Sequence, residues 1–207
     1  MKQALQRRGA TREPRKVVYV LCEGGVTEPH YLDQFYRAQK ERKVALHPPL
    51  TRQGEGLVLV RRCLDFRAKR TAARSFHKND EIWAVFDHDG RDDFIEAIRL
   101  AENEGILVAA STPCIEAWGL MHDRPCNALM TSKQAQRQLA AVMPGFDHDR
   151  NPQFDWPWCH ARLAAAHDNA RAGLVRRAEE DTPYPHGTPW STFYKLLDAI
   201  AGNPREE

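Results

Sequence analysis

The sequence predicts an α/β fold in which helices flank a mostly parallel sheet, followed by a helical C-terminal region. Short apolar runs alternate with amphipathic stretches up to residue 110, a rhythm typical of parallel strands joined by right-handed crossovers. From Thr112 onward the apolar spacing becomes helical. We therefore expect a basic arm at 1–16, an α/β core at 17–125 and a helical region at 126–207 that packs on the core.

Four apolar runs carry the predicted strands. They cover residues 17–22, 44–46, 81–86 and 106–110. Pro48 and Pro49 end the second run, and Gly105 separates the last run from the helix before it.

Helical spacing of apolar residues predicts the remaining elements. The first helix covers about 28–42, with Thr27 as its N-cap and Pro29 in its first turn. Further helices are expected at 57–74, 92–103, a short stretch from Thr112-Pro113, 132–143, 159–180, and after a cap at Thr188-Pro189. Residues 144–157, rich in Pro and Asp, are predicted to form a loop.

Composition excludes several classes of protein. A hydrophobic content of 42% suffices for a sizeable core, and no apolar stretch approaches the ~20 residues of a membrane span. The first 16 residues are basic and polar rather than a secretory signal, so a cytoplasmic protein without membrane contact is expected. Five cysteines, an odd number without C-x-x-C spacing, argue against a disulfide framework and against zinc.

Basic residues are unevenly distributed, although the net charge is only +2. Six of them crowd the N-terminus: Lys2, Arg7, Arg8, Arg12, Arg15 and Lys16. Four more fall on the helix predicted at 159–180: Arg162, Arg171, Arg176 and Arg177. Each set either contacts nucleic-acid phosphates or is a solvated surface, and both interpretations stay open.

Acidic residues follow two of the predicted strands. Asp87 and Asp89 come directly after the run 81–86, and Glu23 follows the run 17–22. Since parallel strands end at the same edge of a sheet, these carboxylates meet there if the two strands are neighbours. Carboxylate oxygens suit Mg²⁺ or Mn²⁺, which predicts metal-assisted phosphate chemistry. The alternative is that these acids are helix caps or turn residues.

Three ordered motifs resemble the RloB-like family. Residues 22–28 (CEGGVTE) are similar to its CEG-x-x-TE opening, and 83–89 (WAVFDHD) to its W-x-VFD-x-D strand. Residues 111–122 (STPCIEAWGLMH) resemble its SNPCFE-x-W-x-x-x-H segment. Thr112, Ile115 and Ala117 depart from this third pattern without touching the acids.

The resemblance implies a TOPRIM-type, Rossmann-like fold. TOPRIM domains carry one acid after the first strand and Asp-x-Asp after a later one, so Glu23, Asp87 and Asp89 would be catalytic residues that bind Mg²⁺ or Mn²⁺. Glu116 is the fourth expected catalytic residue, in support of these three, unless it is an ordinary acid at a helix start. RloB-like proteins are associated with restriction loci and anti-phage defence, sometimes beside an ATPase.

We therefore expect a Mg²⁺-dependent nuclease acting on DNA or RNA in anti-phage defence. One alternative is a non-catalytic module that binds nucleic acid or an ATPase partner, and another is an enzyme for small phosphoesters. The sequence leaves open whether the substrate is DNA, RNA or tRNA, and whether the protein forms a homo-oligomer. It also leaves open the roles of Glu28, His88 and His122, and the two histidines either shuttle protons or contact phosphate, or are structural.

Overall fold

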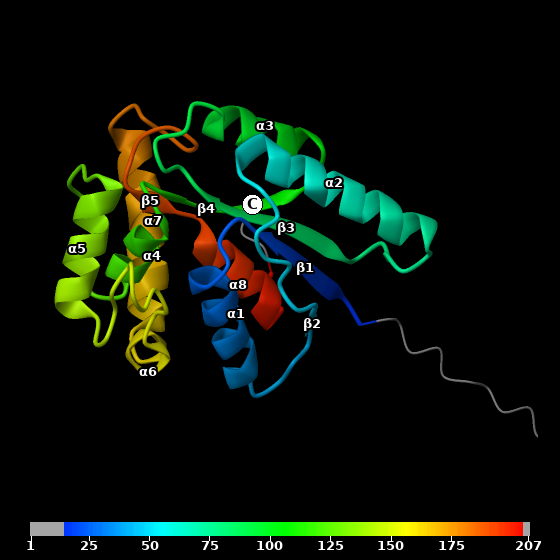
Figure 1. Ribbon diagram of the computed structural model, residues 1–207, viewed down its shortest axis with the longest axis horizontal. Helices are drawn as coiled ribbons and strands as arrows, with labels where there is room; N and C mark the ends of the chain where they lie inside the picture. The colour runs from blue at the N-terminus through cyan, green and yellow to red at the C-terminus, as the bar shows by residue number, and fades with distance from the viewer. Residues whose placement is uncertain (1–14, 205–207) are drawn as a thin grey trace, which may run out of the picture.

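A five-stranded mixed sheet lies at the centre of residues 15–204, the part of the chain that the computed structural model describes (Figure 1). Its order is β2 (Ala45–Leu46), β1 (Val17–Cys22), β3 (Glu81–Asp87), β4 (Leu107–Thr112) and β5 (Trp190–Ser191). The strands β2, β1, β3 and β4 are parallel to one another, and β5 is antiparallel to β4. The predicted α/β fold with a mostly parallel sheet is thus confirmed.

The strands β1 and β3 are direct neighbours, which the convergence of the acids requires. Cys22 is paired with Val85, and the N–H of Glu23 donates to the carbonyl of Val85 at 2.9 Å. On the other side of β3, Asp87 is paired with Ser111 of β4. The carboxyl ends of three strands therefore lie level with one another.

Helices cover both faces of the sheet. α2 (Gly56–Ala72) and α3 (Phe94–Asn103) lie on one face, above the sheet in Figure 1, and α1 (Thr27–Ala38) and α8 (Phe193–Ala201) lie on the other. Alternate residues of β1 point to opposite faces, so the sheet has a hydrophobic core on each side.

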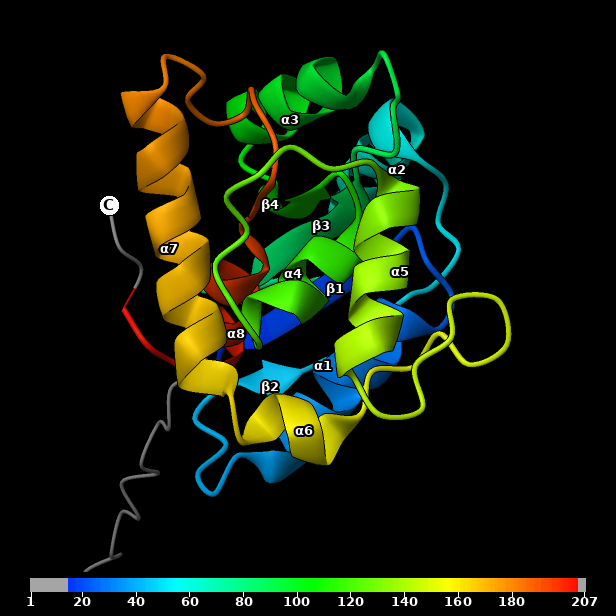
Figure 2. The same ribbon diagram turned by 90° about the vertical axis from the view of Figure 1, so that its left-hand side faces the viewer.

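Four more helices gather beyond the carboxyl ends of the strands. They are α4 (Ile115–Met121), α5 (Ser132–Val142), α6 (Trp156–His160) and α7 (Leu163–Glu179), and Figure 2 views the molecule from their side. Gly119 allows α4 to approach its neighbours closely, because a Cβ there would lie 2.7 Å from Leu139 and 2.9 Å from Phe154. This packing fixes α4 against the strand ends.

Three predicted elements are wrong in detail. Val26, rather than Thr27, holds the N-cap position of α1, and the hydroxyl of Thr27 donates to the carbonyl of Pro152 at 2.8 Å. The helix predicted at 159–180 is divided between α6, which begins within the predicted loop with Asp155 as its N-cap, and α7. The final helix does not follow its expected cap directly, because the chain first pairs with β4 as β5.

The predicted basic arm lies largely outside the described residues, which begin at Arg15. The guanidinium of Arg15 donates to the carbonyl of Val44, and the ammonium of Lys16 pairs with Glu81, both at 2.6 Å. The last two residues of this arm thus contact the core. Among residues 15–204, each helix is too short or too polar to cross a bilayer.

Candidate active site

Five acidic side chains gather where the parallel strands end. Glu23 follows β1, Asp87 and Asp89 stand at the end of β3, and Glu28 and Glu116 open α1 and α4. Their charges act on one another, since Glu28, Asp89 and Glu116 all raise the pKa of Asp87. The structure therefore brings together the four predicted acids and adds Glu28.

Asp87 lies at the centre of this acidic cluster. Its Oδ2 accepts a hydrogen bond of 2.9 Å from the backbone N–H of Ile115, the first residue of α4. Burial raises the pKa of Asp87 well above its usual range, and the charges of Glu28, Asp89 and Glu116 raise it further. A cation at this position would relieve both effects.

Glu28 is buried beside Asp87, with 6% of its surface exposed. Burial, followed by the charges of Glu23, Glu116 and Asp89, raises its pKa to about 7. A Cβ at Gly24 would overlap the carboxylate of Glu28, so the glycine leaves room for this acid. The signal for Glu28 was the last residue of the CEGGVTE motif.

Glu23 faces a basic partner that sequence reasoning missed. The guanidinium of Arg91 donates two hydrogen bonds to its carboxylate, at 2.8 and 2.7 Å, and lies 3.0 Å from Glu55. Burial nevertheless raises the pKa of Glu23, against the lowering effect of Arg91. In this arrangement both carboxylate oxygens of Glu23 are bound by Arg91.

Asp89 links the end of β3 to α5. It adopts the left-handed region with φ 41°, and its Oδ1 accepts a hydrogen bond of 3.0 Å from the hydroxyl of Ser132. Thr131 caps α5 through a reciprocal hydrogen-bonded box with Gln134, which holds the start of the helix in place. Asp89 is exposed, in contrast to Asp87.

Glu116 is buried and contacts a histidine from a distant loop. Its Oε1 accepts from the Nδ1 of His148 at 2.7 Å, and the Nε2 of His148 lies 3.3 Å from the amide of Gln136. Sequence reasoning missed His148. No sequence spacing indicated it, since 32 residues separate Glu116 from His148.

The other two histidines of interest pack within the fold. The ring of His88 lies 4.9 Å from that of Phe94, and its Nδ1 accepts from the N–H of Gly90. His122 is buried between the hydroxyl of Tyr31 and the carbonyl of Trp118, each at 3.0 Å. Burial lowers the pKa of His122 to about 4, so it is neutral at physiological pH.

A comparison with protein families agrees with the sequence motifs that supply the residues of this site. The family model described as "RloB-like protein" matches residues 18–200. The chain belongs to the RloB-like protein family. The matched span contains all five acids, together with Arg91 and His148. No curated protein matches this RloB-like chain.

Two open hollows adjoin the acidic cluster of the RloB-like protein, on either side of Asp89. The first, about 530 Å³, is lined by residues that include His88, Met130 and Thr188. The second, about 730 Å³, extends along α5 past Arg137 and His148. Both have Asp89, Ser132 and Lys133 in their linings, so they adjoin at the start of α5 and together make up the strand-end depression.

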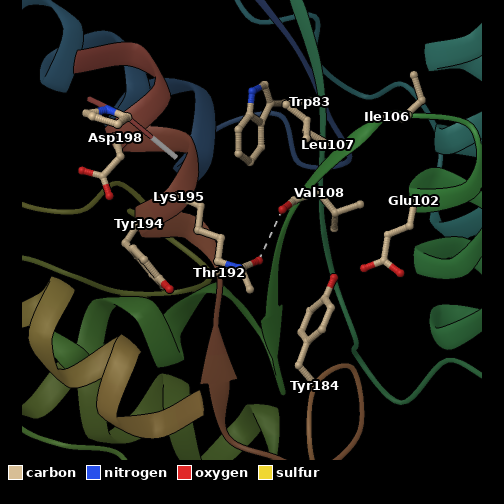
Figure 3. Close-up of a pocket in the computed structure, with 12 residues that line it drawn as sticks. Trp83, Glu102, Ile106, Leu107, Val108, Tyr184, Thr192, Tyr194, Lys195 and Asp198 are labelled. Carbon is tan, nitrogen blue, oxygen red and sulfur yellow. Dashed lines mark hydrogen bonds between the residues drawn. The ribbon is translucent and has the colours of Figure 1, made fainter. Parts of the chain in front are cut away.

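A third cavity, about 350 Å³, lies apart from the acids at the amino end of β4 (Figure 3). The hydroxyl of Thr192 donates to the carbonyl of Val108 on its wall, and the hydroxyl of Tyr184 points toward Glu102. None of the five clustered acids is among its described lining residues. The strand-end depression is therefore the hollow that belongs to the candidate site.

The donor set of the cluster suits a hard divalent cation. Its carboxylate oxygens are ligands that Mg²⁺ and Mn²⁺ prefer, and a bound cation would oppose the burial and the neighbouring negative charges that raise the pKa of Glu28 and Asp87. Within residues 15–204, however, no three His, Cys, Asp or Glu side chains are arranged to hold a metal ion. Metal binding therefore requires acids to move, and Glu23 and Asp89 are tied to Arg91 and Ser132.

Proposed function

We propose that this RloB-like protein is a Mg²⁺-dependent nuclease of TOPRIM type, which hydrolyses phosphodiester bonds of DNA or RNA in anti-phage defence. One observation carries the proposal: half-buried Asp87 of β3 meets buried acids of α1 and α4 at the strand ends, where burial and mutual repulsion raise the pKa of Glu28 and Asp87. Carboxylates with perturbed pKa values are typical of functional sites, and Asp89 connects this cluster to the adjoining hollows.

Asp87 and Glu28 would hold the metal, with Glu23 and Asp89 as further ligands once they leave their present partners. The contact between Glu116 and His148 fixes the orientation of Glu116 beside them. When bound, Mg²⁺ would polarise the phosphodiester and lower the pKa of water for attack. The backbone between β1 and α1 lies close to the acids because Gly24 has no side chain to collide with the carboxylate of Glu28.

Arg91 would bind the phosphate of the substrate in this proposal. Its guanidinium lies at the edge of the cluster, paired with Glu23 and Glu55. If Glu23 turns to the cation, the same guanidinium becomes free to pair with a phosphate, which it recognises through two parallel hydrogen bonds. If Arg91 exchanges its partner Glu23 for a phosphate in this way, substrate binding and metal binding are coupled.

A second candidate function is a non-catalytic module that binds nucleic acid or an ATPase partner. The observation that favours it is the ion pair between Arg91 and Glu23, which keeps one of the acids from a cation. Such a module would bind nucleic acid tightly without cleaving it at any metal concentration.

Cleavage assays test the choice between them. Wild type, Asp87→Asn and the control Asp65→Asn, an exposed α2 acid, would be incubated with plasmid, single-stranded DNA and tRNA in Mg²⁺, Mn²⁺ or EDTA. The nuclease proposal expects metal-dependent cleavage by wild type and by Asp65→Asn, and its loss in Asp87→Asn. Equal cleavage by Asp87→Asn would overturn the proposed site, and binding without cleavage by all three would favour the module.

A further inference from the structure

The hollow lined by His88, Met130 and Thr188 has the size and chemistry of a nucleotide site. Its volume, about 530 Å³, falls within the range of small-molecule pockets. Its described lining holds one carboxylate, that of Asp89, and one ammonium, that of Lys133. It adjoins the acidic cluster through Asp89, so a ligand there lies next to the proposed reacting centre.

Lys133 is placed to contact a phosphate. It follows Ser132, which donates to Asp89, and it is exposed on the first turn of α5. Its side-chain ammonium makes no hydrogen bond or ion pair with any residue in 15–204. Arg137, one turn further along α5, lines the second hollow and is likewise exposed. The hollow beside Arg137 is also lined by Asp89, Asp147 and Asp149, so Lys133 is the cation that the first hollow offers to a phosphate.

The wall of the hollow suits a base and a sugar. Met130 and Pro113 supply apolar contact, and Thr131 and Ser132 supply hydroxyl groups. The Oγ1 of Thr188, on the same wall, is buried without a hydrogen-bond partner among the described residues. A buried polar atom without a partner is costly unless a ligand or water satisfies it.

We propose that this hollow takes one unpaired nucleotide beside the scissile phosphate, with Lys133 on the phosphate and Met130 against the base. The inference rests on the proposed function and names its substrate class, which is single-stranded nucleic acid or an unpaired loop. A base in continuous duplex is stacked and paired, and it enters a pocket only after it is flipped out, at a cost of roughly a few kcal/mol. Unpaired nucleotides avoid that cost.

Binding without cleavage tests this proposal separately from the nuclease. Fluorescence anisotropy in EDTA, which prevents metal-dependent hydrolysis, would compare a short labelled single strand, a blunt duplex of the same sequence and a hairpin with an unpaired loop. RNA and DNA versions of each probe show which sugar is preferred. We expect the single strand and the loop to bind about tenfold more tightly than the duplex.

Three variants locate the binding. Met130→Glu, which replaces the apolar contact to the base with a negative charge, should weaken single-strand binding about tenfold. Lys133→Ala should weaken it and reduce the slope of log affinity against log salt by about 0.7, with recovery in Lys133→Arg. The control Lys69→Ala removes an exposed lysine near the far end of α2 and should change neither quantity. Circular dichroism melts would show that each variant is folded.

Equal affinity for duplex and single strand would overturn the proposal, as would single-strand binding that neither Met130→Glu nor Lys133→Ala weakens. These results would leave the nuclease assignment standing if Asp87-dependent cleavage is observed. Conversely, selective single-strand binding through Lys133 without cleavage would uphold the nucleotide site and remove the catalytic proposal.

Discussion

Arg91 holds Glu23 through two hydrogen bonds of 2.8 and 2.7 Å. The two residues are separated by 68 positions in the sequence, and about a fifth of each side chain is exposed. Because the guanidinium places a positive charge at the edge of five acids, it offsets part of their repulsion. It also competes with any cation for Glu23.

Arg91→Ala should therefore strengthen divalent-cation binding severalfold. Removal of a positive charge deepens the negative potential of the cluster, and Glu23 becomes free to turn toward the ion. Calorimetric titration with Mn²⁺ measures this change, with Arg99→Ala, an exposed arginine of α3, as the matched control. Weaker or unchanged Mn²⁺ binding in Arg91→Ala would show that the ion pair does not compete with the metal.

Glu28 should make the metal-free protein less stable as pH rises. Its folded pKa of about 7 exceeds the ordinary value of 4.5, so folding favours the protonated acid. Its favourable contribution is complete below pH 4.5 and is lost as pH rises through 7, with a change of up to about 3 kcal/mol.

Urea unfolding in EDTA at several pH values from about 5 to about 8 measures this effect. Glu28→Gln should gain stability relative to wild type as pH rises, whereas Glu96→Gln, an exposed acid of α3, should follow wild type throughout. If the free energies of unfolding of wild type and Glu28→Gln change in parallel with pH, the pKa of Glu28 is not raised by folding.

Gly119→Ala should destabilise the fold by about 1–3 kcal/mol, because the added methyl group meets Leu139 and Phe154. The control is Gly173→Ala in α7, where a Cβ has open space and helix propensity favours alanine by roughly 0.5–1 kcal/mol. Thermal melts should move in opposite directions for the two variants. Similar melting temperatures would argue against close packing of α4.

His122 should remain neutral down to about pH 4. Burial lowers its pKa from 6.5 to about 4, so its contribution to stability is complete above pH 6.5 and is lost as pH falls toward 4. The ring proton signals of His122 in an NMR titration report this pKa directly. A His122 pKa near its ordinary value of 6.5 would contradict its place in the core.

Long apolar runs made the central fold predictable from sequence. β1, β3 and β4 each have six or seven residues with strongly apolar character, and their parallel pairing followed from the helices between them. β5 has two residues, too few for a periodic pattern, and it forms only because β4 offers an open edge. The break before α7 was also missed, since apolar spacing continues across it.

The candidate site was predictable where acids stand at the ends of strands. For Glu23, Asp87 and Asp89, parallel topology predicted that they meet on the condition that β1 and β3 are neighbours, and the pairing of these strands meets that condition. The partners Arg91 and His148 were missed because the contacts join segments 68 and 32 residues apart, which sequence spacing does not encode. Glu28 stood in a quoted motif, but only its burial distinguishes it from an ordinary acid at a helix start.

Direct titration of Mn²⁺ into the metal-free protein tests the central claim, that the acids at the strand ends form a divalent-cation site. Asp87→Asn and Glu28→Gln should each weaken binding by at least about tenfold, since each removes a buried charge that a cation would neutralise. Asp65→Asn and Glu96→Gln should bind as wild type does. Equal Mn²⁺ affinity in wild type, Asp87→Asn and Glu28→Gln would contradict the account.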